Sequence, residues 1–94
     1  MATFDLIISG GDVVRPNVHT VDRMDVGIKD GKVTAVGPGL DPAAADAIVD
    51  ATGLLAFPGA VDAHCHWGIY NPLAEDAATE SRAAAQGGTT TAIT

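Results

Sequence analysis

The 94-residue sequence has few aromatic residues, few basic residues and a single cysteine. Aromatic residues make up 4% of the chain, and much of its apolar content is alanine, which contributes little buried area per residue. Five Lys and Arg residues stand against twelve Asp and Glu residues, a formal net charge of −7, and the five bases form no cluster. Because nucleic-acid binding draws its affinity from clustered bases, this balance argues against a nucleic-acid partner.

The single cysteine, Cys65, cannot form an internal disulfide, which is typical of a protein in a reducing compartment. No apolar run reaches the roughly 20 residues that a membrane-spanning helix needs. We expect no signal peptide in the first residues, because Asp5 interrupts the first apolar stretch. We therefore expect a cytoplasmic protein without a membrane partner, and the 47% share of apolar residues predicts a packed core.

The first half of the chain predicts β-structure. "FDLIISGGDVV" predicts a hairpin that turns at Gly10-Gly11, and "MDVGIKDGKVTAVG" predicts a second that turns at Asp30-Gly31. The polar "RPNVHTVDR" between them predicts a loop, and "GPGLDPAAADA" a connection with a short helical turn in its alanines. Two further short strands are expected in "AIVDATG" and "LLAFPG".

The pattern changes after Pro58-Gly59. "AVDAH" predicts a strand, "HWGIYNP" a loop, "LAEDAATESRAAAQ" a helix and "TTTAIT" another strand, which together imply a parallel strand pair with a crossover helix. "GGTTT" has no P-loop lysine and predicts only a helix stop followed by a strand. Parallel sheets usually have many strands and two covered faces, so we expect the chain to be an N-terminal fragment of a longer protein.

The stretch "AVDAHCHWG" carries the candidate chemistry. On a strand, Asp62, His64 and His66 would share one face, and two imidazoles at this spacing can converge on one metal ion. An isolated H-x-H also occurs by chance, with a structural or incidental role. The preceding Pro58-Gly59, the aspartate at minus two and the strand–loop–helix context favour the metal site.

Four further residues could take part in a site, but the sequence favours a metal-ligand or pocket role for none of them. Cys65 has the opposite parity from the histidines and is expected to be a small buried hydrophobe. His19 lies in a polar loop and is expected to be solvated. Trp67 and Tyr70 fit a pocket wall and a core equally well.

The motifs resemble a known family. "FPGAVDAHCH" resembles the P-G-x-x-D-x-H-x-H signature of the amidohydrolase superfamily, and "SRAAAQGGTTTAI" resembles a segment of its cyclic-amidase branch, which holds hydantoinases, dihydropyrimidinases, allantoinases and dihydroorotases. "DLIISGGDVV" and "DVGIKDGKVTAVG" are similar to the first strands of the family's small β-sandwich. The resemblance implies an α/β fold, with residues 1–57 as the N-terminal part of the β-sandwich and 58–94 as the first β-α-β unit of a metal-dependent (β/α)₈ TIM barrel.

The resemblance also implies a site. His64 and His66 match the pair that binds the more buried metal, and Asp62 matches the aspartate that supports them. The cofactor would be one or two divalent metals, zinc first and Fe, Mn, Co or Ni as alternatives, and a metal-activated hydroxide would open the ring amide. The bridging lysine, two further histidines and the general-base aspartate would lie beyond Thr94, so no catalytic residue is assignable and the isolated chain is expected to be inactive.

The substrate and partners follow from the same resemblance. No basic residue stands between His66 and Arg82, which counts against a dihydroorotase and favours a hydantoinase-, dihydropyrimidinase- or allantoinase-like enzyme acting on a small cyclic amide or ureide. A deaminase or N-acyl amino-acid deacylase of the same superfamily, and a non-catalytic scaffold protein, remain alternatives. We expect the full-length protein to form a homo-oligomer, or a complementing chain to supply the rest of the barrel.

Overall fold

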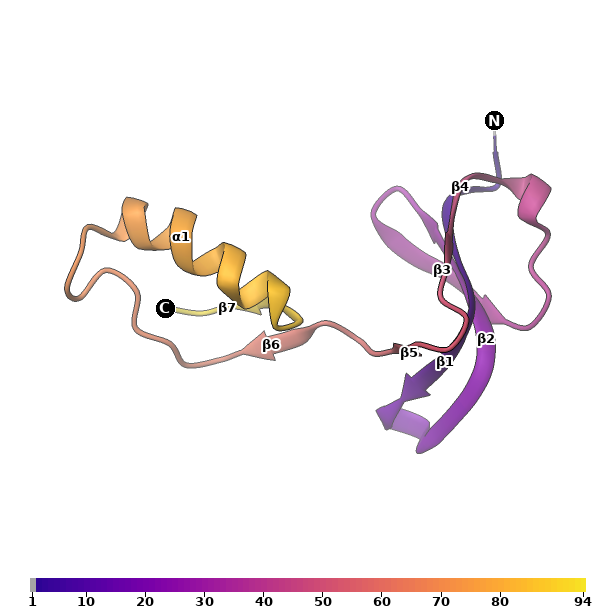
Figure 1. The fold of residues 1–94 in the computed structure, drawn as a ribbon, viewed down its shortest axis with the longest axis horizontal. Coiled ribbons are helices and arrows are strands. Elements are labelled where there is room, and N and C mark those ends of the chain that lie inside the picture. Colours follow the sequence, from indigo (N-terminus) through magenta and orange to yellow (C-terminus); the bar gives the residue numbers. More distant parts are fainter. Residues whose placement is uncertain (1) are drawn as a thin grey trace. The chain divides into compact units, whose positions relative to one another are not determined.

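The computed structural model describes residues 2–94, which fold into two compact units (Figure 1). The first unit ends at Pro58 and the second is Gly59–Thr94. Across the described residues, no helix has the length and apolar character needed to cross a membrane.

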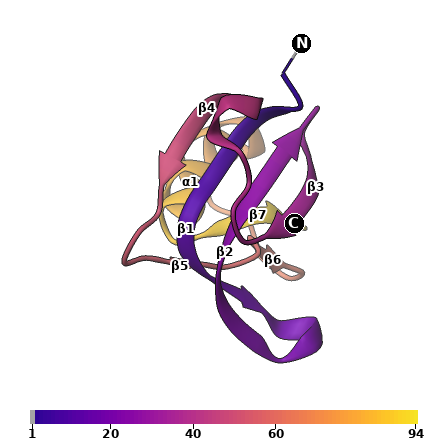
Figure 2. The ribbon, with the colours of Figure 1, turned by 90° about the vertical axis from the view of Figure 1, so that its right-hand side faces the viewer.

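The first unit is a five-stranded sheet with two short 3₁₀ turns. In the order β3-β2-β1-β4, antiparallel pairs join β3 to β2 and β2 to β1, while β4 and the short β5 both run parallel to β1 (Figure 2). The strands are β1 (Phe4–Arg15), β2 (Thr20–Lys29), β3 (Lys32–Gly37), β4 (Ala45–Asp50) and β5 (Leu55–Ala56), and the turns are Pro16–Val18 and Pro42–Ala44. The turn Pro42–Ala44 confirms the helical turn expected after β3, and β4 and β5 confirm the two short strands expected after it.

The hairpin expected at Gly10-Gly11 is wrong. Strand β1 continues through both glycines, and its pairing with β2 slips by one residue between Ile8 and Gly11. Gly10 has φ +72° and its N–H donates to Asp25 Oδ1 at 2.8 Å, so the extra residue forms a β-bulge. Two glycines accept positive φ in a bulge as readily as in a turn, and the sequence could not separate the two.

The real turns of the sheet lie elsewhere. Strands β1 and β2 are joined by Pro16–Val18 and His19, whose φ of 56° is left-handed, so β2 already begins at Thr20 inside the segment expected to be a loop. The turn at Asp30-Gly31 is confirmed: both residues have positive φ, 51° and 75°, as a type I′ hairpin requires.

The core of the first unit is small and aliphatic apart from one ring. Ile7 is 1% exposed, and Phe4, Val13 and Ala51 are also buried. Asp25 is buried as well, and its carboxylate accepts the N–H of Gly10 at 2.8 Å and of Leu40 at 2.9 Å. Buried carboxylates persist when hydrogen-bonded, and this one ties the bulge to the segment after β3.

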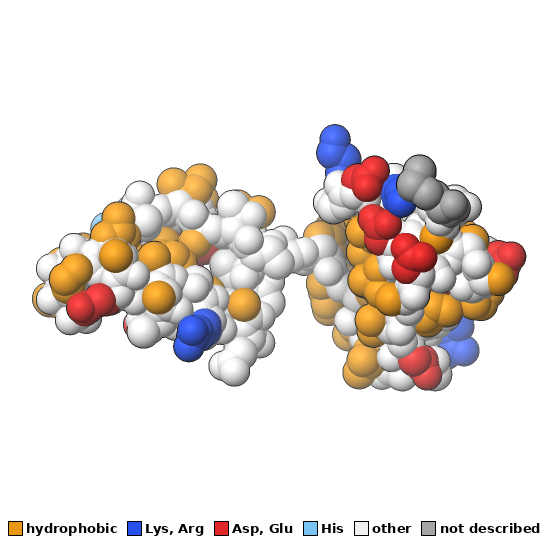
Figure 3. All heavy atoms as spheres, turned by 90° about the horizontal axis from the view of Figure 1, so that it is seen from above, with side chains coloured by type: hydrophobic (Ala, Val, Ile, Leu, Met, Phe, Trp, Pro, Cys, Tyr) orange, Lys and Arg blue, Asp and Glu red, His pale blue; other side chains and the backbone are white. Residues whose placement is uncertain are grey.

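The second unit is a strand–helix–strand motif: β6 (Ala60–Asp62), α1 (Leu73–Gln86) and β7 (Thr89–Ala92). The parallel pairing of β6 with β7 across α1 confirms the crossover expected from the sequence. The helix stop at Gly87, whose N–H donates to Ala83 O at 3.1 Å, and the strand after it are confirmed too. None of residues 59–94 is buried, and Val61 and Ile93 are 64% and 59% exposed. Figure 3 shows hydrophobic side chains on the surface of this unit.

Candidate metal centre

His64 and His66 lie directly after β6. The strand ends at Asp62, and the backbone bends at Ala63 before the first histidine. We expected the strand to continue through both histidines and its alternation to place them on one face. This expectation is wrong, because the strand ends before His64. The cause is the partner strand: β7 pairs with β6 only as far as Asp62, opposite Ala92, where β7 itself ends.

The two imidazoles nevertheless converge. Their Nε2 atoms are 2.9 Å apart, with ring centroids 4.8 Å apart and ring planes at 67°. Both residues are exposed. The two Nε2 atoms lie within hydrogen-bonding distance of each other, and which one donates depends on the tautomer. An imidazole nitrogen that carries no proton is a ligand for a cation.

The pair fits a divalent transition metal. Zinc bound tetrahedrally by nitrogen at roughly 2.0–2.1 Å places two ligand nitrogens about 3.3 Å apart. The observed 2.9 Å between the Nε2 atoms is close to that spacing. Within residues 2–94 no cluster of three or more His, Cys, Asp or Glu side chains could hold a metal, so this fit concerns the two histidines alone.

Asp62 holds the backbone of the histidine segment. Its Oδ1 accepts the N–H of His64 at 3.1 Å, and its carbonyl oxygen accepts the N–H of Ile93 at 2.9 Å. The carboxylate therefore fixes where the chain leaves β6, two residues before the first imidazole. This is the local backbone contact that the D-x-H spacing makes available.

Cys65 lies between the histidines and contacts the segment after β7. Its N–H donates to Ile93 O at 3.2 Å, and its thiol contacts the same oxygen at 3.5 Å. The side chain is half-buried, which corrects the expectation of a buried residue, because no further element covers it within residues 59–94.

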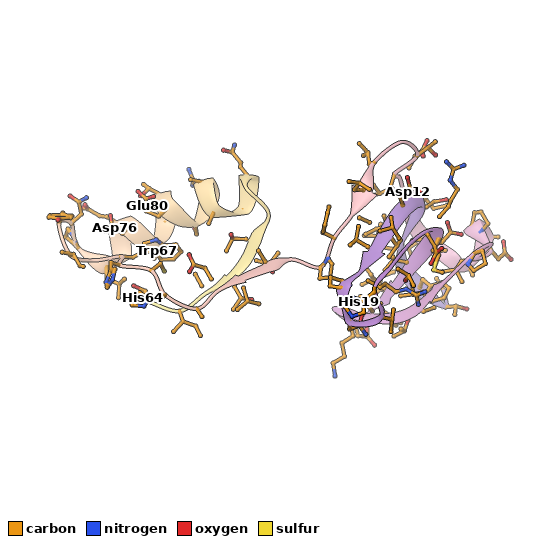
Figure 4. The ribbon with its side chains drawn as sticks, turned by 90° about the horizontal axis from the view of Figure 1, so that it is seen from below. Asp12, His19, His64, Trp67, Asp76 and Glu80 are labelled. Carbon is orange, nitrogen blue, oxygen red and sulfur yellow. The ribbon has the colours of Figure 1, made fainter. Side chains whose placement is uncertain are left out.

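Two side chains from other elements bind the backbone that follows His66. Thr94 Oγ1 accepts the N–H of Trp67 at 2.9 Å, and Asp76 Oδ2, from α1, accepts the N–H of Gly68 at 2.8 Å. An irregular segment has no strand ladder for its N–H groups, so such acceptors replace it. Figure 4 places His64, Trp67 and Asp76 together at the end of the unit where α1 begins.

Sequence reasoning missed Asp76 and Thr94. A negative charge near a helix N-terminus, as at Asp76, is favoured by the helix dipole alone and so does not by itself point to a contact with the loop. The missed signal was a carboxylate in the early turns of a helix that follows a glycine-containing loop, since such a loop presents free N–H groups to it. Thr94 gave no signal, because its contact with Trp67 spans 27 residues of sequence.

The remaining candidate residues lie outside the histidine pair. His19 is exposed and belongs to the first unit. Trp67 is half-buried and lines a hollow of about 450 Å³ with Ser81, Ala84, Ala85 and residues 89–92. Tyr70 is 96% exposed, so it is not part of a core.

Sequence comparison gives relatives over nearly the whole chain, although no family profile matches it. The chain is 46% identical over 94 residues to an allantoinase of Rubrobacter xylanophilus, covering 99% of this chain and 20% of the relative. It is 42% identical over 92 residues to a D-hydantoinase of Ralstonia pickettii, covering 95% and 19%. The chain thus spans about a fifth of the length of the curated relatives it matches.

Solved structures give the same grouping. A D-hydantoinase is similar with a TM-score of 0.72 at 40% identity, covering 95% of this chain and 19% of that one. A D-aminoacylase described by its binuclear metal centre has a TM-score of 0.77 at 29% identity, covering 97% and 18%. The N-acyl-D-glutamate deacylase of Bordetella bronchiseptica, solved with zinc and a phosphonate inhibitor, has a TM-score of 0.74 at 29% identity, covering 95% and 18%.

The allantoinase and the D-hydantoinase are similar to the 94 residues in sequence, and the solved D-hydantoinase, D-aminoacylase and deacylase are similar to them in fold. The sequence signature around His64 and His66 and the strand–helix–strand unit that carries it point to the same grouping. Over its 94 residues the chain is therefore similar, in sequence and in fold, to part of these enzymes of the amidohydrolase superfamily.

Proposed function

We propose that this chain is part of a metal-dependent hydrolase that opens cyclic amide or ureide rings, and that His64 and His66 bind its metal. The observation that carries the proposal is the convergence of the two Nε2 atoms, 2.9 Å apart at the end of β6. Ligand sites of parallel α/β folds gather at the carboxyl ends of strands, where this pair lies.

Zinc is the first choice for the metal. Imidazole nitrogen suits zinc as well as Fe, Mn, Co or Ni, and solved relatives carry zinc or a binuclear metal centre. A divalent metal held here would supply a Lewis acid that lowers the pKa of bound water and polarises an amide carbonyl. Within residues 2–94 the two imidazoles would hold it, while Asp62 fixes the backbone in front of them.

A ring amide or ureide is the substrate class favoured by sequence similarity. The named allantoinase and D-hydantoinase are 46% and 42% identical to the chain, against 29% for the solved D-aminoacylase and deacylase. The lack of a basic residue between His66 and Arg82 also disfavours a substrate whose carboxylate must be held next to the metal.

The architecture that we propose places residues 58–94 as the first β-α-β unit of a (β/α)₈ barrel and residues 1–57 as part of a β-sandwich. Support comes from the parallel pairing of β6 and β7 across α1. It also comes from the lack of any buried side chain among residues 59–94, because a parallel sheet is normally covered on both faces.

Metal binding tests the first part of the proposal. We expect the protein to bind Zn²⁺ or Co²⁺, and His64→Ala or His66→Ala to weaken binding by about 100-fold in a competitive titration, since each removes one of few ligands. His19→Ala is the matched control, because His19 is an exposed histidine of the other unit. Equal affinity of all three variants and the wild type would refute the site.

Substrate tests address the second part. The full-length protein, loaded with metal, is expected to hydrolyse allantoin, hydantoin or dihydrouracil faster than N-acyl-D-amino acids. The opposite order would favour a deacylase, a second candidate supported by the higher TM-score of the D-aminoacylase. The isolated 94 residues are expected to be inactive, because two ligands leave a tetrahedral site half filled. Ring opening by the isolated chain would contradict that.

A further inference from the structure

One carboxylate of α1 bridges the helix to the segment that follows the histidines. Asp76 Oδ2 accepts the N–H of Gly68 at 2.8 Å, and its Oδ1 accepts from Asn71 Nδ2 at 3.4 Å. Gly68 lies two residues after His66 and has φ +82°, so the chain turns there. The contact is local to the second unit and joins two of its elements that are not paired by any ladder.

We infer that Asp76 is a positioning residue for the metal pair: by holding the N–H of Gly68 it fixes the backbone at His66 and keeps the two imidazoles convergent. The inference rests on the proposed function, because it gives Asp76 a role in metal binding. Every residue between Asp62 and Asn71 lies outside a regular strand or helix, so its position depends on individual contacts of this kind.

The other acceptors that bind this segment do not bind the N–H of Gly68. Asp62, Ile93 and Thr94 bind the N–H groups at positions 64, 65 and 67. The next N–H, that of Gly68, has only the Asp76 carboxylate as its acceptor among the described residues. A carboxylate binds an N–H more strongly than a neutral oxygen does, which suits an exposed contact that competes with water.

The neighbouring carboxylates of α1 make no such contact. Glu75 precedes Asp76 in the same helical turn and Glu80 follows one turn later, and neither side chain has a hydrogen-bond partner among the described residues. Glu75 therefore has the same charge and the same place near the helix N-terminus as Asp76, without the bond to the loop. It separates a positioning effect from an effect of helix charge.

The test compares Asp76→Ala, Asp76→Asn and Glu75→Ala in the full-length protein, titrated with Co²⁺. We expect Asp76→Ala to weaken Co²⁺ binding by about tenfold and to change the visible d–d absorption, because supporting contacts of metal ligands have effects of this size. Asp76→Asn keeps an oxygen that accepts from Gly68 and should restore affinity to within about threefold. Glu75→Ala should match the wild type.

Amide hydrogen exchange gives a readout that needs no metal. Asp76→Ala should raise the exchange rate of the Gly68 amide by about tenfold, while Asp76→Asn keeps it protected. If Asp76→Ala loses its helical circular dichroism, Asp76→Asn tests the inference in its place. An Asp76→Asn variant whose Gly68 amide is unprotected but whose Co²⁺ affinity equals that of the wild type overturns the inference.

The outcomes separate the inference from the proposed function. Wild-type affinity and spectrum in a folded Asp76→Ala variant would refute the positioning role and leave the metal centre intact. A wild type that binds no Co²⁺, or whose binding survives His64→Ala, would refute the metal centre and the inference with it.

Discussion

The first unit of the chain has a buried core, whereas the second has none. Ile7, Phe4, Val13 and Ala51 are buried in the sheet that ends at Pro58, and all of residues 59–94 are half-buried or exposed. Conversely, the candidate metal pair belongs to the second unit. The candidate metal pair thus lies in the unit whose packing is less complete within these 94 residues.

The two units also hold their irregular backbone differently. In the first, the buried Asp25 carboxylate binds two N–H groups inside the fold. In the second, the half-buried Asp76 and the exposed Thr94 each accept one N–H group of the segment after His66. We therefore expect substitutions in the first unit to change its free energy of unfolding, and substitutions in the second to change local geometry more than stability.

The largest effect should come from truncating the core of the first unit. Ile7→Ala removes a side chain that is 1% exposed and should cost about 3 kcal/mol in free energy of unfolding. The matched change in the second unit, Ile93→Ala, removes a side chain that is 59% exposed and should cost under about 0.5 kcal/mol. Urea denaturation followed by circular dichroism measures both, and similar losses would break the comparison.

A second test adds volume to the same core. A Cβ on Gly27 would lie 2.5 Å from a ring carbon of Phe4, so Gly27→Ala should cost about 2 kcal/mol in free energy of unfolding. Gly37→Ala is the control, because a Cβ there meets nothing within 4 Å. The difference in denaturation midpoint between the two variants measures the packing, and equal midpoints would show that the core yields freely.

The third test moves to the second unit. A Cβ on Gly59 would overlap the side chain of Thr90, so Gly59→Ala should push β6 away from β7 at a cost of about 1–2 kcal/mol. Because the two units are separate contact clusters, amide exchange should rise in residues 60–62 and 89–92 and stay unchanged around Ile7. Faster exchange at Ile7 as well would mean that the units unfold together.

The sequence predicted the elements of the second unit and several of the first. The helix after Pro72, the strands on either side of it and the turn at Asp30-Gly31 are all confirmed, because each has a strong local signal. The hairpin at Gly10-Gly11 is wrong, since bulge and turn place the same demand on glycine and the deciding contact, with Asp25, lies 15 residues away.

The histidine pair could be singled out from the sequence, whereas the contacts that hold its backbone could not. The spacing of His64 and His66 singled out the pair, and the structure brings their Nε2 atoms together although the strand ends before them. Asp76 and Thr94 reach the same segment across 8 and 27 residues, and no periodicity predicts which side chain meets which free N–H group. Metal binding itself stays a prediction until it is titrated.

The smallest effect concerns an ion pair at the edge of the first unit. The pKa of Asp5 lies below its usual value of 3.8. The main cause is the hydrogen bond that its carboxylate accepts from the N–H of Asp30, and the second is the hydrogen bond that it accepts from Lys29 Nζ. A lowered folded pKa means that the contribution of Asp5 to stability is present above pH 3.8 and is lost as the pH falls through the folded value. Asp5→Asn should therefore be slightly less stable than the wild type at pH 7, and the difference should shrink below pH 3.8. Both side chains are partly exposed, so added salt should shrink it too. If the difference in denaturation midpoint between Asp5→Asn and the wild type stays constant from neutral to acid pH, the charge of Asp5 makes no contribution to stability.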